Sequence, residues 1–189
     1  KESGLVDIPL SSSFFVNSTT LTHPGSIISA VAEGSRILLV ELQALVVDTG
    51  FGMAKRTFLG VDNNRANVMI SAIEKILNLR LSAKDIILNI IGGLSIKEPA
   101  LDLSILMAIL SSYLNQTMPI KIGAIGEIGL TGEIRPVKLI EKRIKEFEKM
   151  GLDECIIPKS NTIDPKDYTI TIVPIKSIKD IKERYFCEV

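Results

Sequence analysis

The sequence predicts one α+β domain, in which a mixed β-sheet is packed with helices. Two β-rich runs, residues 26–32 and 36–47, are separated by the short loop Glu33-Gly34-Ser35, a pattern typical of a hairpin. A short apolar strand at 86–91 leads almost directly into an apolar helix at 101–114. After residue 60, strand-like and helix-like runs alternate to the end of the chain, which favours a mixed sheet.

Size and composition are those of a globular protein. The chain has 189 residues, of which 46% are apolar and 23% charged, enough for one domain with a full core. Its 22 basic residues balance 22 acidic ones, so no overall field draws it to nucleic acid or to a membrane. Any such binding must come from a local patch. The longest apolar run, 101–114, is too short to cross a bilayer.

The cysteine and histidine content argues against disulfides and zinc. Cys155 and Cys187 make no disulfide framework, and no signal peptide precedes them. We therefore expect a cytoplasmic protein. A zinc site is not expected, because His23 is the only histidine.

The first part of the chain contains a connector, the hairpin, a loop and a helix. Residues 1–25 are rich in Ser, Thr and turn residues, and we expect a connector there, ahead of a domain at 26–189. Residues 48–60 carry three glycines and two basic residues between phenylalanines, which indicates an exposed functional loop. Asp62 is a good N-cap for a helix that we expect to end near Leu79.

The strand at 86–91 and the following helix form an elbow of a kind that can present a nucleophile. A glycine pair ends the strand, and Pro99 suits the first turn of the helix. The first N–H groups of such a helix are free to stabilise an anion. The residue just inside the elbow is Ala100, however, and a methyl group can neither attack a carbonyl nor move a proton. We expect Asp102 to accept N–H bonds from the loop or the helix.

The last part of the chain is glycine-rich and then alternates helices with strands. In residues 121–137 a glycine recurs every three positions, which predicts tight hairpins or bulges with close packing. Residues 139–150 form an amphipathic pattern that Gly151 ends in the expected cap position. Residues 154–157 and 169–173 are expected strands, and 177–185 a closing helix.

Other enzyme motifs are absent or incomplete. The stretch GFGMAKRT from Gly50 has no glycine before Lys55, so a phosphate-binding loop is not predicted. A Ser-His-Asp triad would depend on His23 alone, which we interpret as a surface histidine.

A Ser-Lys dyad is the one catalytic arrangement that the composition permits. Ser95 and Ser104 flank the elbow, and Lys97 and Lys142 are possible bases. We expect Ser104 instead to bond a backbone carbonyl of the preceding helical turn, and we favour a structural role for both serines.

Four longer segments carry a resemblance to a known family. They are LVELQALV at 39–46, FGMAKRTFLGVDNNR at 51–65, IIGGLSIKEPALDL at 90–103 and GEIGLTGEIRPV at 126–137, extended by 140–151 and by CIIP at 155–158. Together they resemble the carboxy-terminal Lon-protease-like domain of the RadA (Sms) family of bacterial DNA repair proteins. The resemblance implies the Lon-protease C-terminal-domain fold, which is ribosomal-protein-domain-2-like.

The likeness to Lon peptidases themselves fails at the catalytic positions. Lon-type sites place a serine after the proline of the elbow and a lysine on the helix after the GE-x-x-L-x-G-x-x-x-P strand pair. The matching positions here hold Ala100 and Glu141, and Lys142 is one residue out of step, or about 100° around a helix. We therefore expect no catalytic residue and no peptidase activity.

The family resemblance implies a role in DNA repair and recombination. It implies a hexameric ring, contact with branched, single-stranded or duplex recombination intermediates, and no membrane. ATP with magnesium, and zinc, would be bound by an upstream ATPase region, and we expect no cofactor in the present sequence. The DNA-contact candidates are Lys55, Arg56 and Arg65, with Arg36 on the hairpin a weaker one, and each is equally compatible with a solvated surface charge.

Two other interpretations remain open from the sequence. One is a Lon-type peptidase with a displaced serine and lysine. The other is the amino-terminal domain of a magnesium-chelatase-like ATPase, which shares the elbow and the glycine-rich strand pair.

Overall fold

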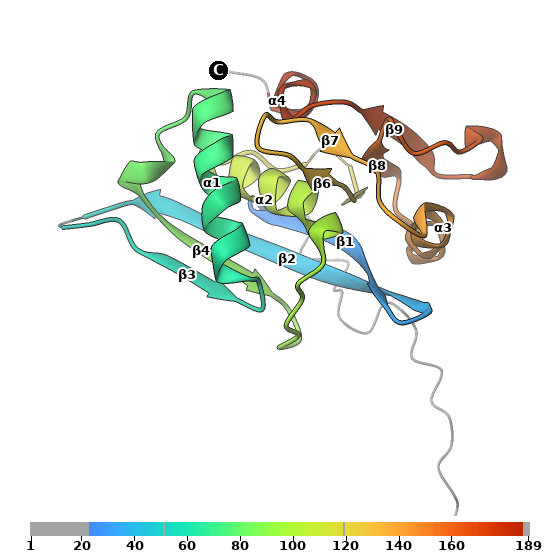
Figure 1. Cartoon of the computed structure of the whole chain (residues 1–189), viewed down its shortest axis with the longest axis horizontal. Helices are drawn as coiled ribbons and strands as arrows, with labels where there is room; N and C mark the ends of the chain where they lie inside the picture. The colour runs from blue at the N-terminus through green and yellow to red at the C-terminus, as the bar shows by residue number, and fades with distance from the viewer. Residues whose placement is uncertain (1–22, 51, 119, 187–189) are drawn as a thin grey trace, which may run out of the picture.

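A seven-stranded mixed sheet forms the centre of the protein (Figure 1). The computed structural model describes residues 23–50, 52–118 and 120–186. β1 (Ser26–Glu33) and β2 (Arg36–Asp48) form the expected hairpin, and β2 also pairs antiparallel with β4 (Lys84–Ile90). The sheet order is β3-β4-β2-β1-β5-β8-β9, and its remaining pairs are parallel. The other strands are β3 (Arg56–Leu59), β5 (Ile122–Ala124), β8 (Glu154–Pro158) and β9 (Thr171–Ile175). The predicted mixed α/β fold is confirmed.

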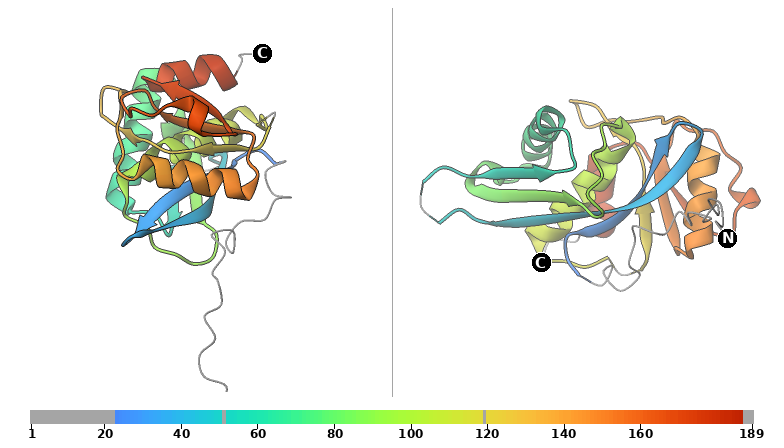
Figure 2. Two further views of the ribbon diagram at one scale, coloured as in Figure 1. Left: turned by 90° about the vertical axis from the view of Figure 1, so that its right-hand side faces the viewer. Right: turned by 90° about the horizontal axis from the view of Figure 1, so that it is seen from below.

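Helices pack on both faces of this sheet and create two core clusters (Figures 1 and 2). α1 (Asn63–Leu77), α2 (Asp102–Leu114) and α4 (Ile178–Tyr185) share one cluster, and α3 (Ile140–Met150) belongs to the other. Alternate residues of a strand point to opposite faces, so β1 contributes to both clusters. Its Ile27 and Val31 lie in the first and its Ile28 and Ala30 in the second.

The prediction of a loop at 48–60 is wrong for its last part, because residues 56–59 form strand β3. β3 pairs parallel with β4 at the edge of the sheet, and Phe58 packs against the larger core cluster. Gly60 follows with a positive φ of 81°, and a Cβ there would lie 2.2 Å from the Leu94 carbonyl oxygen. β3 has only four residues, and its partner β4 lies much later in the chain. So short a strand shows almost no alternation of apolar and polar residues, and this is why the sequence did not predict it.

The close packing predicted around the recurring glycines is confirmed. A Cβ on Gly123 would lie 2.8 Å from the Phe147 ring, and one on Gly129 would lie 1.9 Å from Oε1 of Glu133. The second case occurs in a short hairpin of β6 (Glu127–Ile128) and β7 (Ile134–Arg135). These glycines let α3 and the Glu133 carboxylate approach the backbone.

Both predicted helix caps are confirmed. Asp62 accepts a hydrogen bond from the Arg65 N–H (2.8 Å) at the start of α1, and Gly151 ends α3 with φ 75°. In the described parts of the chain, no helix combines the length and apolarity needed to span a bilayer. Most of the predicted connector, residues 1–22, lies outside the described residues.

Candidate functional site

The elbow between β4 and α2 carries a buried methyl group. Ala100 lies in a short 3-10 helix, η3 (Pro99–Leu101), that precedes α2. It is 3% exposed and belongs to the same core cluster as Ile140 and Ile144 of α3. The position where a Lon-type site would hold its serine is therefore part of the protein interior.

The N–H groups at the start of the helix are already bonded. Those of Leu101 and Asp102 donate to carbonyls in the turn just before them, and that of Leu103 donates to the Gly126 carbonyl at 3.0 Å. The Gly126 N–H in turn donates to the Ala100 carbonyl at 2.9 Å. We expected the first N–H groups of this helix to be free to bind an anion, and this expectation is wrong. Two of these N–H groups donate to carbonyls of the turn itself, and the third donates to a carbonyl of the chain just before β6.

An ion pair between buried Arg143 and partly exposed Glu98 joins the elbow to α3 and β1. Arg143 is 1% exposed, and its guanidinium pairs with the Glu98 carboxylate immediately before Pro99. The same guanidinium donates to the carbonyls of Ala30 and, at 2.9 Å, Lys138. Glu98 also accepts the Ala32 N–H at 2.7 Å. The bonds to Glu98 and Ala30 hold the elbow, the hairpin and α3 together, and the bond to Lys138 joins α3 to the chain just before it.

The orientation of α3 turns its Lys142 away from the elbow. Arg143 faces the interior, and Glu141, two residues earlier and about 200° around the helix, is exposed. Lys142 is exposed as well. Arg143 could have been found in the sequence, since it follows Ile140 at i+3 and precedes Phe147 at i+4, the spacing of the buried face.

Neither flanking serine forms a dyad with a lysine. Ser104 is fully buried, and its hydroxyl donates to the Ala124 carbonyl of β5 at 2.7 Å, so the expected bond to its own helix is wrong. Ser95 is exposed, as is its nearest candidate base in sequence, Lys97.

Arg65 and Asp102 form a second ion pair beside the elbow. The Arg65 Nε donates to Asp102 Oδ1 at 2.7 Å, and its Nη2 contacts Oδ2. The Ile128 N–H donates to the same carboxylate at 3.0 Å, so Asp102 accepts a backbone N–H bond as expected, although the donor belongs to strand β6 and not to the loop or the helix. Burial raises the pKa of the Asp102 carboxyl, while the bonds from Arg65 and Ile128 act in the opposite direction. No group of three or more metal-ligating side chains is present in the described residues.

Lys55 and Arg56 lie where the edge strand β3 begins. The Lys55 N–H donates to Asp85 Oδ1 at 2.8 Å, and the Thr49 hydroxyl donates to the same oxygen at 2.9 Å. These two bonds lower the pKa of the Asp85 carboxyl, so they favour the ionised carboxylate. In this form Asp85 holds the two ends of the loop together. Within the described residues neither Lys55 nor Arg56 forms a salt bridge. Successive residues of an extended segment point to opposite faces, so the two charges flank the sheet edge from either side.

The four basic candidates do not form one patch. Arg36 begins β2 and the Lys55 loop follows its other end, about 40 Å away for a 13-residue strand. Figure 1 shows these two loops at opposite ends of the sheet. Arg65 has its guanidinium engaged with Asp102. Only Lys55 and Arg56 remain together without a salt bridge of their own.

Comparisons with known proteins agree with this geometry. The family model described as subunit ChlI of Mg-chelatase matches residues 59–161, more than half of the chain. The DNA repair protein RadA of Halalkalibacterium halodurans is 40% identical over 188 residues, which cover 97% of this chain and 40% of the relative. RadA of Bacillus subtilis is 41% identical over 162 residues (85% and 35%), and RadA of Helicobacter pylori is 40% identical over 159 (84% and 35%).

The fold and the altered elbow define a Lon-like domain of the ChlI type. The chain belongs to this family and is a homologue of the DNA repair protein RadA. It spans about two fifths of the length of the curated relatives that it matches. The resemblance to magnesium-chelatase-like proteins, left open by the sequence, is thus real at the level of the family model, whereas the match over nearly the whole chain is to RadA.

Loss of Arg143 should destabilise the protein strongly. Arg143→Ala removes a buried guanidinium and leaves the partly exposed Glu98 carboxylate and the Ala30 and Lys138 carbonyls without their donor, and loss of such a partner costs about 1 to 3 kcal/mol in the free energy of unfolding. Lys142→Ala, at the exposed neighbouring position, should change it by less than about 0.5 kcal/mol. Urea unfolding followed by circular dichroism measures both, and equal stability of the two variants would contradict the role assigned to Arg143.

Proposed function

We propose that this chain is a non-catalytic Lon-like domain that serves ring assembly and DNA contact in a RadA-type repair protein. The observation that carries the proposal is the closed elbow. A buried methyl group, bonded N–H groups and the pair of Arg143 with Glu98 occupy the region where a peptidase would need a nucleophile, an anion site and an amine. A polypeptide substrate has no place to bind there, so the scaffold serves through its surfaces.

For DNA contact we propose the sheet edge at Lys55 and Arg56. Phosphate groups attract basic side chains that are not already paired, and a DNA backbone passing this edge would meet the exposed Lys55 and the half-buried Arg56. Arg56 lines a hollow of about 490 Å³ together with Met53, which is 89% exposed. Asp85 fixes the loop through the Lys55 backbone N–H and leaves the lysine side chain exposed. We leave Arg36 out of this contact because it lies at the other end of β2, and Arg65 because its guanidinium is paired with Asp102.

The double variant Lys55→Ala/Arg56→Ala tests the contact. Each lost phosphate contact lowers the slope of log affinity against log salt by about 0.9 on duplex DNA and about 0.7 on single strands, so the double variant should bind more weakly, with a slope smaller by about 1.8 on duplex DNA and about 1.4 on single strands. Fluorescence anisotropy with duplex, single-stranded and branched DNA at several salt concentrations measures this. The matched control Lys142→Ala/Lys145→Ala removes two exposed charges from α3 and should bind as the unmodified chain does. If the first variant also binds unchanged, the contact is not at this edge.

For assembly we propose the surface between α1 and the β6–β7 turn. Leu130 at the tip of that turn is 71% exposed and Val68 of α1 is 51% exposed, and both line a hollow of about 330 Å³. The charged side chains of Arg65, Glu127 and Arg135 line the same hollow. An apolar centre with charged groups around it is the arrangement that protein interfaces use.

Substitution of Leu130 should weaken self-association. Leu130→Glu places a charge at the centre of the proposed interface, so oligomers should dissociate at protein concentrations at which the unmodified chain is assembled. Analytical ultracentrifugation measures the change. The control Ile120→Glu alters an exposed apolar residue elsewhere and should leave the oligomeric state as it is. Assembly that withstands Leu130→Glu would place the interface on another surface.

A further inference from the structure

The sheet has an open apolar face next to α3. Ile37 and Leu39 of β2 pack in the α3 cluster, and Leu45 and Val47 point to the same face because they are also odd-numbered residues of this strand. The latter two are 52% and 43% exposed. Helix α3 therefore covers this face of β2 in the first half of the strand. Within the described structure, the same face is uncovered in the second half.

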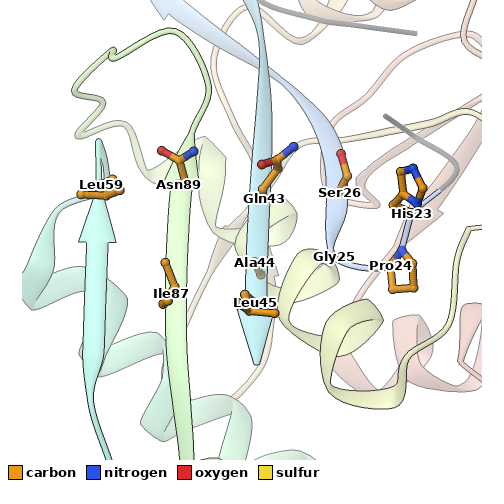
Figure 3. Close-up of a pocket in the computed structure, with 10 residues that line it drawn as sticks. All are labelled: His23, Pro24, Gly25, Ser26, Gln43, Ala44, Leu45, Leu59, Ile87 and Asn89. Carbon is orange, nitrogen blue, oxygen red and sulfur yellow. The ribbon is translucent and has the colours of Figure 1, made fainter. Parts of the chain in front are cut away.

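A hollow of about 400 Å³ crosses this face (Figure 3). Its floor consists of register partners on neighbouring strands, with Leu45 opposite Ile87 in one row and Gln43 opposite Asn89 in the next. Leu59 of the edge strand continues the second row and is 52% exposed. Figure 3 shows these side chains pointing into the same space from β2, β3 and β4.

The chain enters the sheet at the rim of this hollow. His23, Pro24, Gly25 and Ser26 line one side of it. Gly25 is fixed on both sides, because the Ala44 N–H donates to its carbonyl at 2.8 Å and its own N–H donates to the Ser111 hydroxyl at 2.8 Å. It has φ 89°, and a Cβ there would lie 2.2 Å from the Ala44 carbonyl oxygen. The residues ahead of His23 therefore start from a fixed point beside the apolar face.

The sequence ahead of this point matches the hollow in polarity. Residues 8–22, IPLSSSFFVNSTTLT, contain no ionisable side chain and carry Leu10, Phe14, Phe15 and Val16 among hydroxyl and amide residues. The hollow has His23 as its one titratable lining residue. The Asn89 amide makes no hydrogen bond within the described residues and is partly exposed in the hollow, so a polar backbone or hydroxyl group can pair with it.

We propose that residues 8–22 dock in cis on the open face of β2, β4 and β3, with the Phe14–Val16 cluster on Leu45, Ile87 and Leu59. The reach is sufficient. Eight residues join Phe15 to His23 and span up to about 26 Å when extended, whereas β3 lies two strand spacings, about 10 Å, from β2. Burial of two aromatic rings on an exposed apolar face is favourable. The proposal does not depend on DNA contact or on ring assembly.

A single tryptophan can report on this docking, since the chain contains none. Phe14→Trp and Phe15→Trp are made separately in the full chain, and acrylamide quenching and the emission maximum are measured for each. At least one tryptophan should be blue-shifted and protected from quenching. The protection should disappear when Leu45→Lys and Ile87→Lys are added, because they place two charges in the hollow. The control Ile120→Lys, at an exposed apolar residue outside the hollow, should leave it intact.

Three results would contradict the proposal. The first is quenching of both tryptophans as free as that of a tryptophan peptide in solution. The second is protection that persists after Leu45→Lys and Ile87→Lys in a chain whose circular dichroism is native. The third is protection that grows with protein concentration, because the segment would then dock on a second copy. Isotope-filtered NOEs from the Phe14 and Phe15 rings to the Leu45 and Ile87 methyls provide an independent measurement without any substitution.

Discussion

The pairing of Arg143 with Glu98 is the constraint on which the rest of the elbow depends. A guanidinium that is almost fully buried must have its donors bonded, and here the Glu98 carboxylate and the carbonyls of Ala30 and Lys138 accept from it. These partners belong to the elbow, to β1 and to the chain just before α3. Because the pair fixes the rotation of α3, it also places Ile140 and Ile144 against Ala100 and turns Glu141 to solvent.

A second pair supports the elbow from the other side, and the exposed surfaces lie elsewhere. Arg65 of α1 holds Asp102 at the start of α2, and the same carboxylate fixes the β6–β7 turn through the Ile128 N–H. The basic sheet edge, the hollow at Leu130 and the open face at Leu45 all lie outside the elbow that these two ion pairs hold together. The hollow at Leu130 lies on α1 and the β6–β7 turn, away from the other two surfaces, whereas the basic edge and the open face share strand β3, with Arg56 at its start and Leu59 at its end. Assembly therefore need not compete with DNA contact or with docking of the N-terminal segment.

Local patterns in the sequence predicted much of this fold, and the misses are contacts between distant segments. The hairpin, the strand-to-helix elbow and the caps at Asp62 and Gly151 depend on neighbouring residues, and they are confirmed. Strand β3 was missed because only its pairing with β4 defines it. The pairing of Arg65 with Asp102 joins residues 37 positions apart, so the sequence offered Arg65 only as a DNA-contact candidate or a solvated surface charge. The buried Arg143 was missed although its spacing placed it on the apolar face, because a charged residue on an amphipathic helix is usually exposed.

The central claim is that the elbow lacks a serine and that position 100 is also buried, so a substrate has no access to it. The most direct measurement is the reaction of the Ala100→Ser variant with a serine-directed fluorophosphonate, followed by intact mass, with a serine peptidase as positive control. The account predicts no adduct in the variant or in the unmodified chain, because position 100 is buried and the neighbouring helix N–H groups are bonded. An adduct at residue 100, Ser95 or Ser104 in natively folded protein would contradict it.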